Sequence, residues 1–168
     1  MRYLIILILF ILSGCAGKVS APVEEKYKIP LPIGLVNDYE KSFTSEEEKR
    51  IDSLIQSINA RGKVKFAFAT FDSSYVPDSL FAKYSLQVAK QWGIGDKNKS
   101  NGIFLCLSLT MRNVQIRTGL GVEDLVTDSM ISRVIDSTII PAFKRKEFAQ
   151  GVYSGIEMLG RMADEKVQ

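Results

Sequence analysis

The segment that most constrains the fold is Val64–Phe71, in which large apolar side chains alternate with small apolar ones. A strand with one face in water alternates apolar with polar residues, so a strand that is apolar at nearly every position needs cover on both faces. The run Ile103–Leu109 is more apolar still, and Val114–Thr118 follows it across the turn Thr110–Asn113. These last two strands are predicted to pair as a hairpin in the same sheet.

Four amphipathic segments supply the helices that such a sheet needs. The first is predicted to begin at a capping box, with Ser45 as the cap and Glu48 reaching back to it, and to end at Arg61-Gly62. The others are predicted from Pro77-Asp78 to Trp92, from a cap near Thr127 to just before Pro141, and from Glu147 to Met162. The order helix, strand, helix, strand, strand, helix, helix predicts an α/β fold, a three-layer α/β/α sandwich with a short mixed sheet.

Composition limits the chemistry more than it limits the fold. The chain has 168 residues, of which 46% are hydrophobic, and a net charge of only +3, so a single globular domain is expected and nucleic-acid binding is not. Histidine is absent, which excludes catalytic sites built on Ser-His-Asp or Cys-His and every histidine-liganded metal centre. Gly93, Gly95, Gly119 and Gly121 match no nucleotide-binding pattern and are expected to serve backbone angles that other residues resist. No haem is expected.

The N-terminus is typical of an exported lipoprotein. Arg2 precedes the apolar run Tyr3–Leu12, which is too short to span a bilayer and fits the core of a secretory signal. The following Ser13-Gly14-Cys15 completes a lipobox, in which small residues precede the cysteine that receives the lipid. Residues 1–14 are therefore predicted to be a signal peptide and Cys15 the lipidated N-terminus; the alternative is an ordinary signal that contains a cysteine.

This N-terminus predicts the location and the organisation of the mature chain. We expect an exported protein, anchored by lipid to the cell membrane or outer membrane and facing the periplasm. Residues 15–33 are predicted to be the lipidated cysteine and a polar, proline-containing tether, and residues 34–163 the domain. The second cysteine, Cys106, lies in an apolar run and is expected to be a buried hydrophobe rather than a nucleophile.

Several short motifs occur in the order found in the TPM domain family, which groups thylakoid, phosphatase and MOLO-type proteins. They are Gly34–Tyr39, Trp92–Gly95, Asn101–Ile103, Arg112, Ile116–Glu123, Leu125–Asp128, Ile140–Phe143 and Gly151. Each motif is weak alone, but the ordered set covers the whole predicted domain, and the chain resembles this family. The resemblance implies an α/β/α sandwich. It also implies diverse functions, because some relatives are calcium-binding acid phosphatases and others are accessory proteins.

The family-like segments contain oxygen donors that are candidates for a metal site. These are Asp38, Asn101, Glu123, Asp124 and Asp128. Carboxylate and amide oxygens suit calcium or magnesium, and loops beside strand ends are a common place for ligands. The hypothesis requires the loops to converge at one edge of the sheet. The alternative is that each residue has a local role in a turn, a helix start or an ion pair.

Basic residues offer a second, weaker candidate site. Arg112 and Arg117 carry the forked donors that bind phosphate, although a solvent-facing or ion-paired role is the simpler interpretation. The run Lys144-Arg145-Lys146 is expected to be a solvated face, with contact to anionic lipid as the alternative.

Two functional hypotheses follow from these features. The first is a non-catalytic or accessory module that lipid holds near an envelope protein partner. The second is a calcium- or magnesium-dependent phosphatase in which Asp38, Glu123 and Asp128 act as ligands or base.

Overall fold

The computed structural model describes residues 27–165, so the predicted signal peptide and Cys15 lie outside the described residues. Within this range one sheet has the strand order β1-β2-β3-β4. The strands are β1 (Val36–Asp38), β2 (Lys65–Thr70), β3 (Gly102–Ser108) and β4 (Asn113–Thr118). The first three are parallel, and β4 returns antiparallel to β3. The predicted mixed sheet and its hairpin are therefore confirmed.

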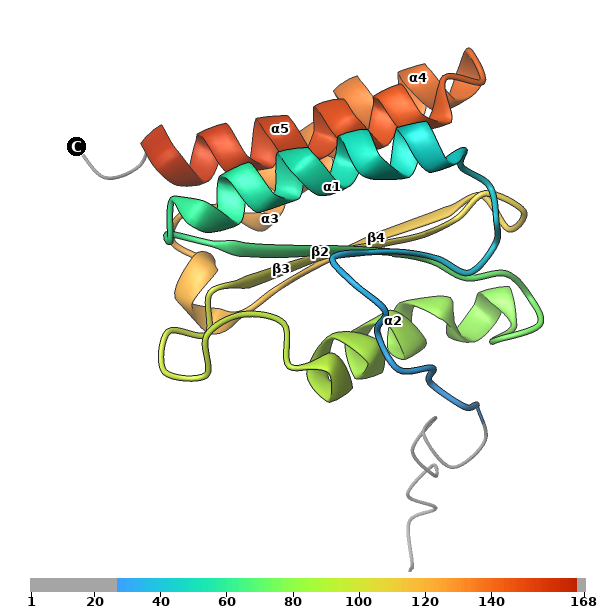
Figure 1. The fold of residues 1–168 in the computed structure, drawn as a ribbon, viewed down its shortest axis with the longest axis horizontal. Coiled ribbons are helices and arrows are strands. Elements are labelled where there is room, and N and C mark those ends of the chain that lie inside the picture. Colours follow the sequence, from blue (N-terminus) through green and yellow to red (C-terminus); the bar gives the residue numbers. More distant parts are fainter. Residues whose placement is uncertain (1–26, 166–168) are drawn as a thin grey trace, which may run out of the picture.

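Helices cover both faces of this sheet (Figure 1). One face carries α2 (Asp78–Trp92), and the other carries α1 (Ser45–Ala60) and α5 (Phe148–Glu165). The α1/α5 side also holds α3 (Asp128–Val134), the π-helix η3 (Ile135–Ile139) and α4 (Ile140–Lys144), and the 3-10 turn η2 (Leu120–Val122) follows β4. The predicted α/β/α sandwich is confirmed. Across residues 27–165, no helix has the length and apolar character needed to cross a bilayer.

Alternation along the two central strands divides the core into two unequal halves. Phe66 and Phe68 of β2 pack on the α1/α5 side, whereas Ala67 and Ala69 face α2. The small alanines leave room on the α2 side for a cluster of rings formed by Tyr39, Phe71, Tyr75, Tyr84, Trp92 and Phe104. The alternation of large and small residues in the sequence therefore reflects a sheet covered on both faces, in which aromatic rings fill the space between the alanines and α2.

The described chain begins with a segment that packs onto this aromatic cluster. The ring nitrogen of Trp92 donates to the carbonyl of Pro30 at 2.8 Å, and the Tyr39 hydroxyl donates to the carbonyl of Leu31 at 2.7 Å. The Tyr84 hydroxyl donates to the Lys28 carbonyl at 3.2 Å, and Ile29 is buried. The tether predicted over residues 15–33 therefore overlaps, from residue 27 onward, a segment that belongs to the packed domain.

Helix starts differ from the prediction by one residue at α1. The capping box uses Thr44 as the N-cap and Glu47 as its partner, with the Glu47 amide donating to the Thr44 hydroxyl and the Glu47 carboxylate accepting from the Thr44 amide. Ser45 and Glu48 have the same spacing, so the sequence fits both registers. The predicted cap at Ser45 is wrong by one position.

The predicted third helix is three consecutive helical pieces. Its α-helical hydrogen bonding gives way to a π-helix at Ile135–Ile139 and then resumes in α4. Pro141 is the second residue of α4, and the helix continues past it to Lys144. The expectation that Pro141 ends the helix is therefore wrong.

Candidate functional site

The carboxyl end of the parallel strands carries polar side chains that bond to one another. Asp38 ends β1 beside Thr70, which ends β2. The Thr70 hydroxyl donates to one Asp38 oxygen at 2.5 Å, and the Phe43 amide donates to the other at 2.8 Å. Both oxygens of this predicted metal ligand are therefore engaged in joining β1, β2 and the chain that leads to α1.

Glu40, which sequence reasoning missed, lies at the same end of the sheet. Its carboxylate accepts four hydrogen bonds from the β3–β4 turn: from the Ser108 hydroxyl at 2.8 Å, the Leu109 amide at 2.9 Å, the Thr110 amide at 3.3 Å and the Thr110 hydroxyl at 2.8 Å. A carboxylate with this many donors is held in place. Glu40 therefore fixes the turn rather than facing a ligand.

Asn101 lies at the opposite end of the sheet. It directly precedes β3, where Gly102 pairs with Lys65 at the start of β2, whereas Asp38 pairs with Thr70 at the end of β2. Five residue steps of a strand separate these levels by roughly 17 Å. The prediction that Asp38 and Asn101 come to one edge is wrong, because the parallel strands carry them to opposite ends.

The remaining predicted ligands follow β4 and therefore lie at the same end of the sheet as Asn101. Glu123 and Asp124 are exposed beyond η2, and Asp128 is in the first turn of α3. The side chain of Asn101 is already bonded, since its oxygen accepts from the Asp96 amide and its nitrogen donates to the Lys63 carbonyl. Among residues 27–165, no group of three or more acidic or cysteine side chains is placed to hold a metal ion.

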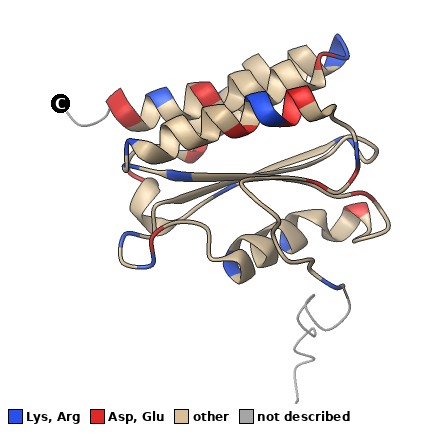
Figure 2. Cartoon of the chain, viewed as in Figure 1, with Lys and Arg blue, Asp and Glu red and all other residues tan. Residues whose placement is uncertain are grey.

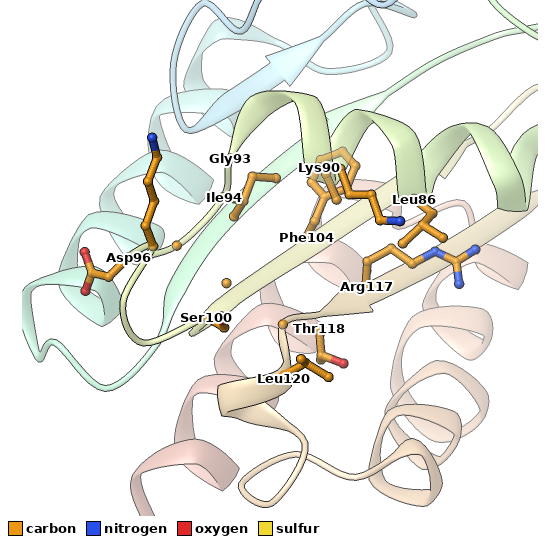
Figure 3. Close-up of a pocket in the computed structure, with 15 residues that line it drawn as sticks. Leu86, Lys90, Gly93, Ile94, Asp96, Ser100, Phe104, Arg117, Thr118 and Leu120 are labelled. Carbon is orange, nitrogen blue, oxygen red and sulfur yellow. The ribbon is translucent and has the colours of Figure 1, made fainter. Parts of the chain in front are cut away.

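A cavity of about 480 Å³ lies at this same end, between the last turns of α2 and the end of β4 (Figure 3). Its walls come from α2, from the loop between α2 and β3, and from the end of β4. The residues that line it include Leu86, Ala89, Lys90, Gly93, Ile94, Asp96, Lys97, Phe104, Arg117, Thr118 and Leu120. Leu86 and Leu120 are 41% and 78% exposed, which is unusual for leucine and gives the mouth of the cavity an apolar rim.

Two glycines show why the loops around this cavity hold their shape. Gly95 has a φ of 102°, and a Cβ there would lie 2.5 Å from the Gly102 nitrogen. Gly119 has an ordinary φ, but a Cβ would lie 2.1 Å from the Ser100 carbonyl oxygen. The α2–β3 loop therefore packs directly against the backbone that follows β4, and the predicted need for special backbone angles explains only the first of these glycines.

The two arginines proposed for phosphate binding are separated along the β3–β4 hairpin. Arg117 borders the cavity, and its guanidinium donates to the Ala82 carbonyl at 2.6 Å, the Ser85 hydroxyl at 3.0 Å and the Gln115 amide oxygen at 2.8 Å. Burial lowers the pKa of this guanidinium from its usual value. Arg112 is exposed in the turn at the other end of β4. The two side chains do not form one phosphate site.

Comparison with known proteins identifies the fold family. The model of the TPM domain matches residues 36–162. The chain belongs to the TPM domain family. A search of the curated proteins matched none at a significant level.

Solved structures of similar domains agree with this membership. The N-terminal domain of a P. gingivalis protein is 30% identical, with a TM-score of 0.69 over 77% of this chain and 82% of that one. The BA42 protein of the psychrophilic bacterium Bizionia argentinensis is 20% identical, with a TM-score of 0.63 over 76% of this chain and 86% of that one. The N-terminal domain of a Corynebacterium glutamicum protein is 15% identical, with a TM-score of 0.61 over 84% and 86%. The last two likenesses concern the fold alone.

Proposed function

We propose that this TPM domain is a lipid-anchored accessory module of the cell envelope. Cys15 carries the lipid, the anchor lies in the cell membrane or outer membrane, and the domain faces the periplasm and binds an envelope protein partner. The observation that carries the proposal is the signal-like run Tyr3–Leu12 followed by Ser13-Gly14-Cys15. The packing of residues 27–32 against Tyr39, Tyr84 and Trp92 adds to it. This packing puts the start of the folded domain close to Cys15 along the chain.

The spacing from the anchor limits where the domain can act. Twelve positions separate Cys15 from Tyr27, so even a fully extended chain reaches only about 40 Å. This distance is similar to the diameter of a small domain. The module is therefore expected to act on partners at or near the membrane surface.

The chemistry of the candidate site supports binding over catalysis. Asp38 and Glu40 hold the carboxyl end of the sheet together through their hydrogen bonds. The side-chain oxygen and nitrogen of Asn101 are both hydrogen-bonded within the protein. The cavity beside α2 has an apolar mouth formed by Leu86 and Leu120. Such a mouth suits contact with another apolar surface.

Replacing the anchoring cysteine tests the proposal. We expect Cys15→Ser to move the protein from the membrane fraction to the soluble periplasmic fraction. Cys106→Ala is the matched control, because Cys106 is buried in β3 and this variant is expected to stay with the membrane. If Cys15→Ser remains membrane-bound, lipid on Cys15 is not the anchor.

The competing phosphatase hypothesis is tested with the mature protein. A metal that binds only the native state must raise the melting temperature as its concentration increases. We expect no rise with calcium or magnesium and no hydrolysis of p-nitrophenyl phosphate in their presence. A concentration-dependent rise together with metal-dependent turnover would replace the accessory role with a catalytic one.

A further inference from the structure

The outer edge of β4 has backbone groups available for another strand. Gly119 donates its amide hydrogen to the Gly102 carbonyl at 2.9 Å. In an antiparallel pair the backbone groups of successive residues point alternately toward and away from the partner strand. Gly119 and every second residue before it in β4 therefore point their amides and carbonyls toward β3. The residues between them, Val114, Ile116 and Thr118, therefore point their amides and carbonyls outward. β4 is the last strand of the sheet, and among residues 27–165 no further strand pairs with it.

A second cavity, of about 900 Å³, lies beside the start of β4 on the α4 side. Its apolar lining comes from the hairpin, from the ends of the π-helix and from the α4–α5 turn. The apolar residues are Leu109, Val114, Ile135, Ile140, Phe143 and Phe148. Because Val114 belongs to both the cavity and the free edge, a strand added to β4 would have side chains facing this cavity.

Three cations border this cavity: Arg112, Lys144 and Lys146. All three are exposed, and no ion pair or hydrogen bond of their side chains is present in the described part of the chain. Their neighbour Arg145 differs, since it pairs with Glu147 at 2.8 Å. Figure 2 shows this basic turn between α4 and α5. No acidic residue lines the cavity, so its charge favours an anionic occupant.

The backbone around the cavity is specialised. Arg112 and Lys146 have φ values of 55° and 63°, a region that side chains other than glycine occupy at a cost. Ile135 opens the π-helix and Ile140 follows it, and both line the cavity. Single turns of π-helix occur often at functional sites, because the extra residue redirects side chains.

We propose that the β4 edge and this basic-rimmed cavity bind an extended acidic segment of a partner protein. The segment pairs as a strand with the outward backbone groups of Val114, Ile116 and Thr118. One of its apolar side chains enters the cavity. Carboxylates two residues before and after that side chain lie on the same face of the strand and contact Arg112, Lys144 and Lys146. A lipid headgroup would match the charge, but it would leave the backbone groups of β4 unused. This inference rests on the proposed partner-binding function and names its surface.

A peptide of defined register tests the inference directly. The probe is the blocked, fluorescein-labelled peptide Thr-Glu-Thr-Leu-Thr-Glu-Thr, whose glutamates and leucine share one face of a strand. Its control, Thr-Thr-Glu-Leu-Glu-Thr-Thr, has the same composition but places the glutamates on the other face. By fluorescence anisotropy, we expect the control and a lysine version of the probe to bind at least about tenfold more weakly.

Protein variants test the two halves of the surface separately. Val114→Pro removes an outward amide without removing a bond to β3, and Lys144→Glu with Lys146→Glu reverses the rim charge. Each is expected to weaken binding of the probe at least about tenfold, whereas Lys49→Glu, an exposed change on α1, is expected to leave it unchanged.

Hydrogen exchange of the unmodified protein gives a readout that does not depend on the folding of a variant. With the probe bound, exchange should slow at the amides of Val114, Ile116 and Thr118, and not at Gln115 or Arg117, which already bond to β3. Equal binding of both peptides, or unchanged exchange at the β4 edge, would overturn the inference. So would binding to phosphatidylglycerol vesicles that depends on the lysines while the peptide fails to bind. Loss of anchoring in Cys15→Ser is scored separately and does not depend on any of these results.

Discussion

At the scale of single residues, acidic side chains of this domain stabilise its loops. Glu40 connects the end of β1 to the β3–β4 turn through bonds to both backbone and hydroxyl groups. Asp38 does the same between β1, β2 and Phe43. Asp38, which the sequence suggests as a metal ligand, and Glu40 therefore both hold segments of the fold together.

Removal of the Glu40 carboxylate should destabilise the domain. Hydrogen bonds to a charged group contribute about 1.5–3 kcal/mol, so we expect Glu40→Ala to lower the free energy of unfolding by about 2 kcal/mol. This corresponds to a fall in melting temperature of roughly 5–10 °C. Glu46→Ala is the control, because Glu46 is exposed in the first turn of α1. Equal effects of the two variants in chemical denaturation would show that the Glu40 bonds add no stability.

Cys106 should be unreactive while the protein is folded. Burial raises the pKa of its thiol well above the usual value, so the unfolded chain ionises first as the pH rises. Its contribution to stability is therefore complete below the ordinary thiol pKa and declines above it. We expect labelling by a thiol reagent at pH 8 to require unfolding, and the alkaline loss of stability to be smaller in Cys106→Ala. Rapid labelling of the native protein would contradict the buried position of β3.

At the scale of elements, α5 approaches its neighbours through glycines. A Cβ at Gly155 would lie 2.8 Å from the Ile139 side chain of the π-helix, and one at Gly160 would lie 2.8 Å from Ile58 of α1. The Ile139 side chain of the π-helix therefore packs directly against α5 at Gly155. Ile135, which opens the π-helix, and Ile140, which follows it, line the basic-rimmed cavity.

A methyl group added at Gly155 tests how closely α5 packs against the π-helix. Gly155→Ala should gain helix propensity, yet we expect it to destabilise the domain by about 1–3 kcal/mol, because the core there is already filled. Ile139→Ala removes the clashing atoms, so the double variant should be less destabilised than the sum of the single changes. A stabilising Gly155→Ala in thermal melts would show that the contact between α5 and the π-helix is looser than described.

The elements that sequence patterns predict are those with several turns or alternations. Val64–Phe71 and the amphipathic helices have enough residues for a period to emerge, and the three-layer order follows from them. β1 was not predicted, because Val36–Asp38 is too short to alternate and its pairing with β2 is long-range. The π-helix leaves no pattern of its own, and Thr44 and Ser45 offer two equivalent caps.

The predicted metal site is wrong because β1 is too short to be recognised in the sequence. Without β1, nothing in the sequence fixes the direction in which Asp38 leaves the sheet, so its distance from Asn101 is not predictable. The sequence does not predict the basic-rimmed cavity either, because Arg112 and Lys144 are far apart along the chain. The sequence singles out Arg112 and the run Lys144-Arg145-Lys146 separately, but nothing in it places them side by side. The exposure of the run agrees with the expected solvated face.

At the scale of the whole molecule, the N-terminal segment of the described chain and the proposed binding edge lie in different parts of the sandwich. The N-terminal segment packs on the α2 side, and its Leu31 carbonyl bonds to Tyr39, which follows β1. β1 and β4 are the two opposite edges of the sheet. The proposed anchoring through the N-terminal segment would therefore leave the β4 edge free for a partner.

Mass spectrometry of the N-terminal peptide from membrane-purified protein tests whether lipid on Cys15 anchors the domain. We expect a mature chain that begins at Cys15 and carries the mass of a lipid on that residue. A chain that retains residues before position 15, or that has an unmodified cysteine, would contradict it.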